Sequence, residues 1–242
     1  MADANKLKRF RVVLGKPSSF TLVELLVVVS IIGLLAALAV PVTKKAIASG
    51  KTGKAVSNLK QIGVLMNCYA GENNGCLPIM VNWNNGGSGP ETWSFWQNLL
   101  RQQAGLSTNA SPDGRLMPEI FYDPVLGKPE HPWGTFGAND GTMSALGGPA
   151  SKASPTGRGT SLASLSSLSQ KVIVASAIDA PSSRYKGSWY FQGPEWVGGS
   201  GQCQPDPRHI GKTLCLFADG HTELLDTQRM SSADRRKYFL RD

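Results

Sequence analysis

Apolar residues are concentrated in one stretch near the N-terminus. Residues 25–42 form 18 consecutive positions without a charge, most of them Val, Ile, Leu or Ala. Adding residues 20–24 lengthens the stretch to 23 positions with one ionised side chain, Glu24. A helix needs about 20 apolar residues to cross the hydrocarbon of a bilayer. The stretch therefore predicts a transmembrane helix over residues 20–42, because a cleaved secretory signal has a shorter apolar region of about 7–15 residues.

A second helical pattern follows the span. Pro41 is expected to end or bend the helix near Val40, because proline lacks a backbone N–H. Beyond it, residues 43–76 have an apolar stripe at three- and four-residue spacing, which predicts an amphipathic extension of the helix. The main members of this stripe are Val56, Leu59, Ile62, Gly63, Leu65, Met66 and Tyr69.

Residues 77–242 predict a loop-rich soluble head whose strands come late in the chain. Residues 91–103 are expected to form a short helix, and residues 171–178 (KVIVASAI) form a β-rich run. Residues 213–218 and 221–225 flank Asp219-Gly220, a preferred pair for a tight type I′ turn in which both residues have positive φ. The expected fold class is α+β, with the long N-terminal helix packed on a small antiparallel sheet and with loop-rich insertions.

The charge of the chain is distributed around the apolar stretch. Lys and Arg number 25 against 17 Asp and Glu, a formal net charge of +8. Residues 1–19 hold five basic side chains and one acid, and five lysines follow the span with no acid between Glu24 and Glu72. This pattern fits a membrane-flanking chain better than a nucleic-acid-binding groove, so no nucleic-acid partner is expected. The equal numbers of basic residues on both sides do not decide the orientation.

Glu24 is the one charge in the apolar stretch, and such a residue usually has a partner. One interpretation makes it an interfacial acid that complements the dipole at the start of the helix. In the other, a cut just before Phe20 creates an α-amine one helical turn away. That cation would then neutralise Glu24, within one chain or between two packed chains.

Residues 20–28 (FTLVELLVV) resemble the N-terminal segment of type IV prepilins and type II secretion pseudopilins. The resemblance implies that residues 1–19 are a basic leader, which a membrane-embedded aspartic prepilin peptidase removes on the cytoplasmic side. The same enzyme would methylate Phe20, and Glu24 would pair with the amine of a neighbouring subunit during assembly. Pro41 matches a helix-kinking proline of the family. Ser19 departs from the pattern, since the residue before the cut is usually Gly.

Two further matches resemble a large pseudopilin-like family with a C-terminal motif of His, nine residues and Asp-Gly. The first lies in residues 58–78, and in the second His209 is followed by nine residues and then by Asp219-Gly220. The resemblance implies a structural subunit in a homo- or hetero-oligomeric filament with other pseudopilins, assembled by a type II secretion or type IV pilus-like system. It also implies an inner-membrane anchor with a cytoplasmic N-terminus and a periplasmic or extracellular head.

The candidate chemistry of the head is sparse. His209 and Asp219 would lie about 30 Å apart on an extended strand and could share a ligand only after a sharp bend at Gly211. Because no pairing of a nucleophile with a base is visible, no enzymatic activity is expected. Some major pseudopilins bind calcium in a C-terminal loop, so Asp179, Asp206 and Asp219 are candidate calcium ligands, although EF-hand spacing is missing. No other cofactor is expected.

The cysteines and tryptophans leave two questions open. Disulfides are permitted outside the cytoplasm, and four cysteines allow three pairings, with free buried thiols as the alternative. These cysteines are Cys68, Cys76, Cys203 and Cys215. Trp83, Trp93 and Trp96 are either core residues or a carbohydrate-stacking patch. The patch would suit an alternative function, in which the anchor holds an extracellular glycan-binding module.

Overall fold

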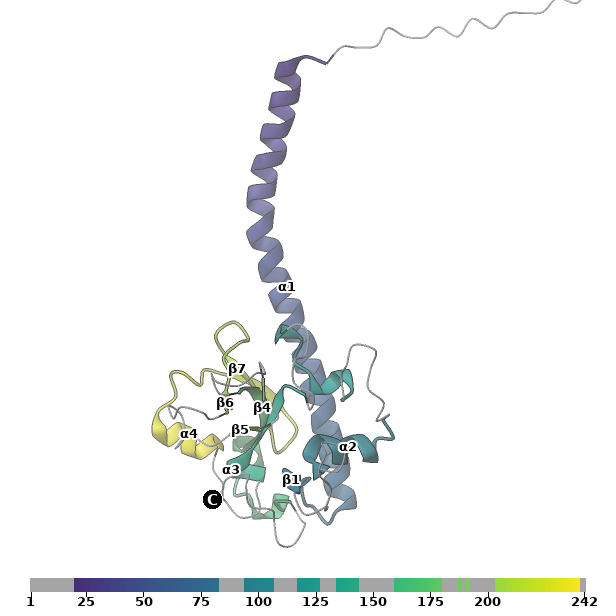
Figure 1. Ribbon diagram of the computed structural model, residues 1–242. Coiled ribbons are helices and arrows are strands. Elements are labelled where there is room, and N and C mark those ends of the chain that lie inside the picture. Colours follow the sequence, from purple (N-terminus) through teal and green to yellow (C-terminus); the bar gives the residue numbers. More distant parts are fainter. Residues whose placement is uncertain are drawn as a thin grey trace, which may run out of the picture. The chain divides into compact units, whose positions relative to one another are not determined.

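The computed structural model describes residues 20–82, 94–106, 117–126, 134–143, 159–179, 187–188, 190–191 and 203–239. The chain divides into two compact units, Met1–Lys45 and Ala46–Asp242. Helix α1 (Leu22–Glu72) is the longest element and is shown in Figure 1. It is followed by a mixed α+β arrangement of short helices and a sheet of six strands. The predicted fold class is therefore confirmed, as a long helix packed on a sheet.

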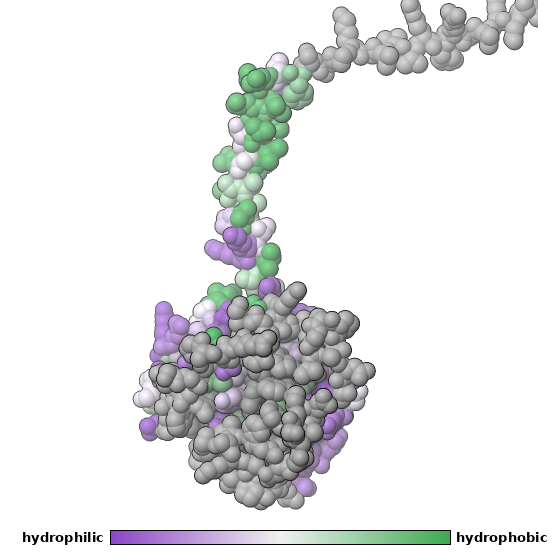
Figure 2. Space-filling view, viewed as in Figure 1, coloured by the Kyte–Doolittle hydropathy of each residue, from purple (hydrophilic) through white to green (hydrophobic). Residues whose placement is uncertain are grey.

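In the first unit, α1 is apolar and exposed. By length and composition, the helix could cross a membrane, and none of its most apolar 18-residue stretch is buried within the chain. Figure 2 shows these residues mostly in the green of the hydrophobic end of the scale. Two hydroxyls form hydrogen bonds with the backbone of the same helix. Ser30 Oγ donates to the Leu26 carbonyl at 2.7 Å, and Thr43 Oγ1 donates to the Val40 carbonyl at 3.0 Å. Such internal satisfaction is what a helix in hydrocarbon requires.

One predicted helix boundary differs from the structure, and at Pro41 one of the two expected outcomes, an end of the helix, is excluded. Pro41 lies inside α1, which does not end there. A helix can continue through proline when the following turns hold it, at the cost of one backbone hydrogen bond. The extension was expected to run to residue 76, but α1 ends at Glu72. Asn74 and Gly75 then take positive φ values of 55° and 73°, and the Gly75 N–H donates to the Ala70 carbonyl at 2.8 Å. Left-handed residues of this kind commonly close a helix.

In the second unit, one stripe of α1 is buried. Its members recur at the helical period expected of an amphipathic helix. They are Thr52, Ala55, Asn58, Leu59, Ile62, Gly63, Met66 and Ala70. Val56, Leu65 and Tyr69 pack at the margin of the same core. The amphipathic prediction is therefore confirmed for this part of the helix.

The main sheet has the order β5-β3-β4-β7-β8, and β6 also pairs with β4. The central strands are β4 (Val172–Ile178) and β7 (Thr213–Phe217), with β3 (Phe136–Asn139) beside β4 and β8 (Thr222–Leu225) beside β7. The short strands are β5 (Tyr190–Phe191) and β6 (Gln204–Pro205). The three late strands predicted from the sequence are present. The sheet was expected to be antiparallel throughout, but β3 and β5 pair in parallel.

The two faces of the sheet pack against different helices. Leu214 and Leu216 of β7 join a core with α1 and with α2 (Trp96–Gln103). Cys215 and Phe217 of the same strand face a second core that holds Phe239 of α4 (Ser232–Phe239). This alternation is the two-residue period of a strand buried on both sides. Figure 1 shows α4 on one side of the strands and α2 on the other.

The remaining short elements connect these layers. Strand β1 (Val81–Asn82) pairs with β2 (Ser94–Phe95), which leads directly into α2. The helix expected over residues 91–103 therefore begins only at Trp96, because Ser94 and Phe95 are held in a strand pair. Short 3-10 turns cover residues Glu119–Phe121, Pro124–Leu126, Leu162–Ser164 and Leu168–Gln170, and α3 covers Asp140–Met143.

The turn between β7 and β8 differs from the expected type I′ turn. Gly220 has a φ of 92°, but Asp219 is not among the residues with positive φ. The Gly220 N–H donates to the Phe217 carbonyl, and the Phe217 N–H donates to the His221 carbonyl, both at 2.9 Å. This is a three-residue loop with one left-handed glycine. Asp219 stabilises it through its Oδ1, which accepts the His221 N–H at 3.1 Å.

Candidate functional site

The start of α1 is closed by reciprocal hydrogen bonds between Thr21 and Glu24. Glu24 Oε2 accepts the Thr21 N–H at 2.9 Å and the Thr21 hydroxyl at 2.8 Å, while the Glu24 N–H donates to Thr21 Oγ1 at 3.2 Å. This is a capping box, which satisfies donors that the first turn of a helix leaves unpaired. In the uncut chain, the carboxylate of Glu24 therefore serves the helix terminus. Phe20 lies just before this cap with 72% of its surface exposed, and Ser19 lies outside the described residues.

His209 lies in a tight turn just before β7. Its backbone N–H donates to the Lys212 carbonyl at 3.0 Å, and the Lys212 N–H returns to the His209 carbonyl at 3.1 Å. Ile210 and Gly211 make this reversal with positive φ values of 56° and 79°. The sharp bend considered at Gly211 is thus present. It does not bring His209 to Asp219, because β7 separates this turn from the turn that contains Asp219.

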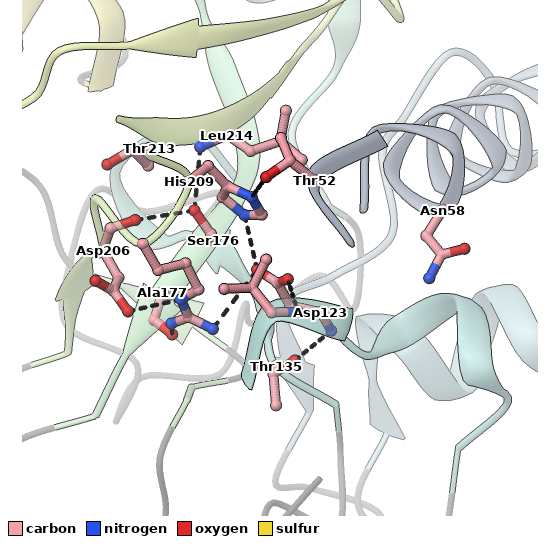
Figure 3. A network of polar contacts seen from close by, with 12 residues as sticks. Thr52, Asn58, Asp123, Thr135, Ser176, Ala177, Asp206, His209, Thr213 and Leu214 are labelled. Carbon is pink, nitrogen blue, oxygen red and sulfur yellow. Dashed lines mark hydrogen bonds and ion pairs between the residues drawn. The ribbon is translucent and has the colours of Figure 1, made fainter. Parts of the chain in front are cut away.

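The imidazole of His209 is fully buried between two distant parts of the chain (Figure 3). Its Nε2 lies 2.9 Å from Asp123 Oδ2, and its Nδ1 lies 3.3 Å from Thr52 Oγ1 on α1. A carboxylate only accepts hydrogen bonds, so Nε2 carries a proton. In the neutral ring, Nδ1 then accepts the Thr52 hydroxyl. The histidine therefore joins α1 to the segment that precedes β3.

Asp123 is held on all sides by the same network. Its backbone N–H donates to Thr135 Oγ1 at 2.6 Å, and its Oδ1 accepts the Val125 N–H at 3.0 Å. Arg208 Nη1 lies 3.6 Å from Asp123 Oδ2, while Arg208 Nε donates to Asp206 Oδ2 at 2.6 Å. Figure 3 shows Asp123 and His209 pointing toward one another, with Thr52 of α1 beside the imidazole. Buried charges are tolerated where they are paired and hydrogen-bonded in this way.

The Asp219-Gly220 turn contacts α1 at a different point. A Cβ added to Gly220 would lie 3.0 Å from Asn67 Nδ2, and one added to Gly63 would lie 2.9 Å from Leu216 Cδ1 and 3.5 Å from the Gly220 carbonyl. The backbones approach closely there because both positions are glycine. His209 and Gly220 therefore place the two ends of β7 against α1, at Thr52 and at Asn67. Strand β7 (Thr213–Phe217) lies within the nine residues that separate His209 from Asp219.

This arrangement suits packing better than catalysis. The side chains of His209 and Asp123 have no exposed surface, and only 8% of Thr52 is exposed. A substrate therefore does not reach the imidazole in this structure. We call the contacts of His209, Asp123, Thr52 and Gly220 the helix clamp.

The three candidate calcium ligands have different partners. Asp206 pairs with Arg208, and Asp219 Oδ1 lies 2.5 Å from His221 Nδ1. Asp179 Oδ1 accepts the thiol of Cys203 at 3.1 Å. Within the described residues, no three His, Cys, Asp or Glu side chains are grouped closely enough to hold a metal ion. Calcium binding stays a prediction.

One of the three tryptophans of the possible carbohydrate-stacking patch lies in the core. Trp96 is fully buried and packs edge-on against Phe121, with ring centroids 5.8 Å apart. It therefore belongs to the core, which was the alternative interpretation. Trp83 and Trp93 lie outside the described residues.

The four cysteines are free thiols in the structure: Cys68 is exposed, Cys76 half-buried, and Cys203 and Cys215 buried. Burial raises the pKa of Cys203 to about 11 and raises the pKa of Cys215 further. Because the thiolate is the reactive form, we expect Ellman's reagent at pH 8 to modify Cys68 and Cys76 first. The two buried thiols should react roughly 100-fold more slowly.

The measurement is a time course of thiol release from the folded chain and from the chain in guanidinium without reductant. Four thiols should appear after denaturation. Two thiols after denaturation would reveal a disulfide, and rapid labelling of Cys215 in the folded chain would contradict its burial.

Comparison with known proteins identifies the N-terminal segment. Residues 16–40 match the family described as the prokaryotic N-terminal methylation motif. This match includes Phe20, Glu24 and most of the apolar stretch, and it supports a prepilin-like protein that is structural rather than enzymatic. No curated protein and no solved structure matches the chain. The match covers residues 16–40 alone and includes none of the residues of the helix clamp.

Proposed function

We propose that the chain is the precursor of a pseudopilin-like structural subunit. Prepilin peptidase removes residues 1–19 between Ser19 and Phe20 and methylates the new N-terminus. A type II secretion or type IV pilus-like system then assembles the subunit with copies of itself or with other pseudopilins. The observation that carries the proposal is that the methylation motif coincides with an apolar helix whose side chains are exposed.

The dimensions of the segment support a membrane anchor. Residues 22–42 of α1 form 21 helical positions, or about 32 Å, against a hydrocarbon thickness of about 30 Å. The proposed domains are the leader (1–19), the span (20–42), the helix extension (43–76) and the head (77–242). We place the anchor in the inner membrane, with the leader in the cytoplasm and the head in the periplasm or outside the cell.

The capping box suggests how Glu24 acts before and after cleavage. In the precursor, the Thr21 contacts satisfy the carboxylate, which lowers its cost in the bilayer. After cleavage, the α-amine of Phe20 lies one residue before the Thr21 N–H that Glu24 already accepts. An ammonium group then competes for the carboxylate, and a charged hydrogen bond is worth about 1.5–3 kcal/mol, more than a neutral one. We propose that, in the filament, the carboxylate of Glu24 pairs with the α-amine of a neighbouring subunit.

The helix clamp supports the same role. A subunit that is pulled from the bilayer into a filament needs a head that stays attached to its helix. In the clamp, His209 Nδ1 lies within hydrogen-bond distance of Thr52 Oγ1 at one end of β7, and Gly220 lies close to Asn67 at the other. A membrane-tethered glycan-binding module is the weaker alternative, because Trp96 is part of the core.

The test is co-expression of the full chain with a prepilin peptidase and its assembly platform in a bacterial membrane. We expect the 19-residue leader to be lost and the mature chain to enter the sheared, sedimenting fraction. Substitution of Ser19 by Gly, the usual residue of the motif, should preserve both results, whereas Ser19→Arg should block cleavage. A chain that stays monomeric in the membrane after cleavage would refute the filament role.

A further inference from the structure

Two lysines follow the apolar stretch of α1 almost directly. Lys44 and Lys45, the lysine pair, come two and three positions after Val42, and all three residues are exposed. At a rise of 1.5 Å per residue, the two Cα atoms lie about 3 and 4.5 Å beyond the stretch along the helix axis. The headgroup layer of one leaflet is about 5–8 Å thick, which is half the difference between the whole bilayer and its hydrocarbon core. A span that ends at Val42 therefore places the lysine pair among the headgroups.

The charge of the lysine pair is not compensated within the helix. The sequence has no acid between Glu24 and Glu72, so no carboxylate of α1 lies one helical turn away from either lysine. Among the residues that the structure describes, no ion pair involves these two lysines. Lys54 shows the contrast, because its Nζ lies 2.7 Å from Glu119 Oε1. The lysine pair thus presents two positive charges to its surroundings.

The lysine pair does not serve the end of the helix either. Basic side chains often complement the negative end of the helix dipole, but this effect falls off within the last turn. Helix α1 continues from Lys45 to Glu72, and its last turn holds no basic residue. Figure 2 shows a purple, hydrophilic group on the helix beyond its green stretch. The positive charges are therefore available to a partner outside the chain.

We propose that the lysine pair binds anionic phospholipids in the leaflet on the head side of the span. The phosphate of an anionic phospholipid has no positive group beside it, whereas the headgroup amine of a zwitterionic phospholipid compensates its phosphate. A lysine near an anionic surface strengthens binding about fivefold, equivalent to about 1 kcal/mol. Successive helical side chains point about 100° apart, so each lysine contacts a different lipid. The proposal rests on the proposed membrane anchor but on neither leader cleavage nor filament assembly.

The experiment measures which lipids the full chain retains. The chain is reconstituted into nanodiscs with equal amounts of phosphatidylglycerol and phosphatidylethanolamine, and native mass spectrometry counts the lipids that stay bound when the discs are disrupted. We expect at least a fivefold preference for phosphatidylglycerol. Equal retention of the two lipids overturns this proposal alone, whereas a chain that does not enter the discs overturns the membrane anchor with it.

The variants locate the preference on the helix. Lys44→Gln combined with Lys45→Gln should lower the preference at least fivefold, and the corresponding double substitution by Arg should preserve it. The matched control combines Lys54→Gln with Lys60→Gln, which removes the same charge about 18 and 27 Å beyond Val42. Both positions lie farther out than the headgroup layer and one Debye length of about 8 Å, so this control should change the preference less than twofold. The leader is the same in every variant and does not contribute to these differences.

The other partner of opposite charge is a carboxylate of a neighbouring subunit. Incorporation of the double Gln variant into filaments, measured in the sheared fraction, separates it from lipid. If this variant keeps the preference for phosphatidylglycerol but loses incorporation, the proposal is overturned and the lysine pair is assigned to a subunit contact. A loss of preference as large in the control as in the double Gln variant also overturns it, because the effect would then not depend on position.

Discussion

Replacement of Glu24 by Gln is expected to leave leader cleavage intact and to reduce incorporation into filaments at least about tenfold. Tenfold corresponds to about 1.4 kcal/mol, less than the 1.5–3 kcal/mol that a hydrogen bond to a charged group is worth. Gln at this position retains the capping box with Thr21, because Glu and Gln both serve at the N3 position of this motif. The substitution therefore removes the charge but keeps the helix terminus. Leader loss on a denaturing gel and the amount of chain in the sheared fraction measure the two effects.

Thr21→Val is the matched control for this experiment. It removes the hydroxyl that contacts Glu24 Oε2 at 2.8 Å but keeps the carboxylate. If the charge of Glu24 is what matters for assembly, Thr21→Val should assemble well and Glu24→Gln should not. The reverse result would assign Glu24 to helix capping alone, which was the other interpretation of this residue.

Replacement of His209 by Ala is expected to destabilise the head by about 3 kcal/mol. The change leaves the buried carboxylate of Asp123 without its closest partner, and breaking a buried pair costs about 3–5 kcal/mol. Arg208 Nη1 also lies 3.6 Å from Asp123 Oδ2. It partly compensates the carboxylate, so the expected loss of stability is near the lower end of this range. For a unit of this size, the Tm should fall by roughly 6–12 °C, measured by tryptophan fluorescence during heating.

His221→Ala is the matched control, because His221 also pairs with an aspartate but is 42% exposed. Exposed pairs contribute little, so this variant should stay within about 0.5 kcal/mol of the original chain. At the other end of the clamp, Gly220→Ala should cost about 1–2 kcal/mol, because alanine is strained at a φ of 92°. If His209→Ala unfolds at the same temperature as His221→Ala, the helix clamp is not what stabilises the head.

Local patterns in the sequence predicted most of the fold. The apolar stretch and the amphipathic stripe predicted α1, because a helical period is visible over many residues. The β-rich runs near residues 171–178 and 213–225, the latter interrupted by the Asp-Gly turn pair, predicted β4, β7 and β8, because these signals are also local. The errors lie where tertiary contacts override local preference: Ser94 and Phe95 pair with β1 and delay α2, and Asp219 keeps a negative φ because its side chain caps the turn.

Only part of the helix clamp could be predicted from the sequence. His209 and Asp219-Gly220 were marked by a motif, but their partners were not. Asp123 and Thr52 lie 86 and 157 residues from His209 along the chain. No periodicity or spacing connects residues so far apart, so only the folded chain brings them together. Gly63 was noted as part of an apolar stripe, while its role in the close approach of β7 required the structure.

The N-terminus of the native chain tests the central proposal most directly. Mass spectrometry of the protein isolated from its own membrane should find a chain that begins at Phe20 with one methyl group on its α-amine. Such a terminus would supply the cation that Glu24 is proposed to bind in the filament. A native chain that still carries residues 1–19 would contradict the account and leave α1 as a plain membrane anchor.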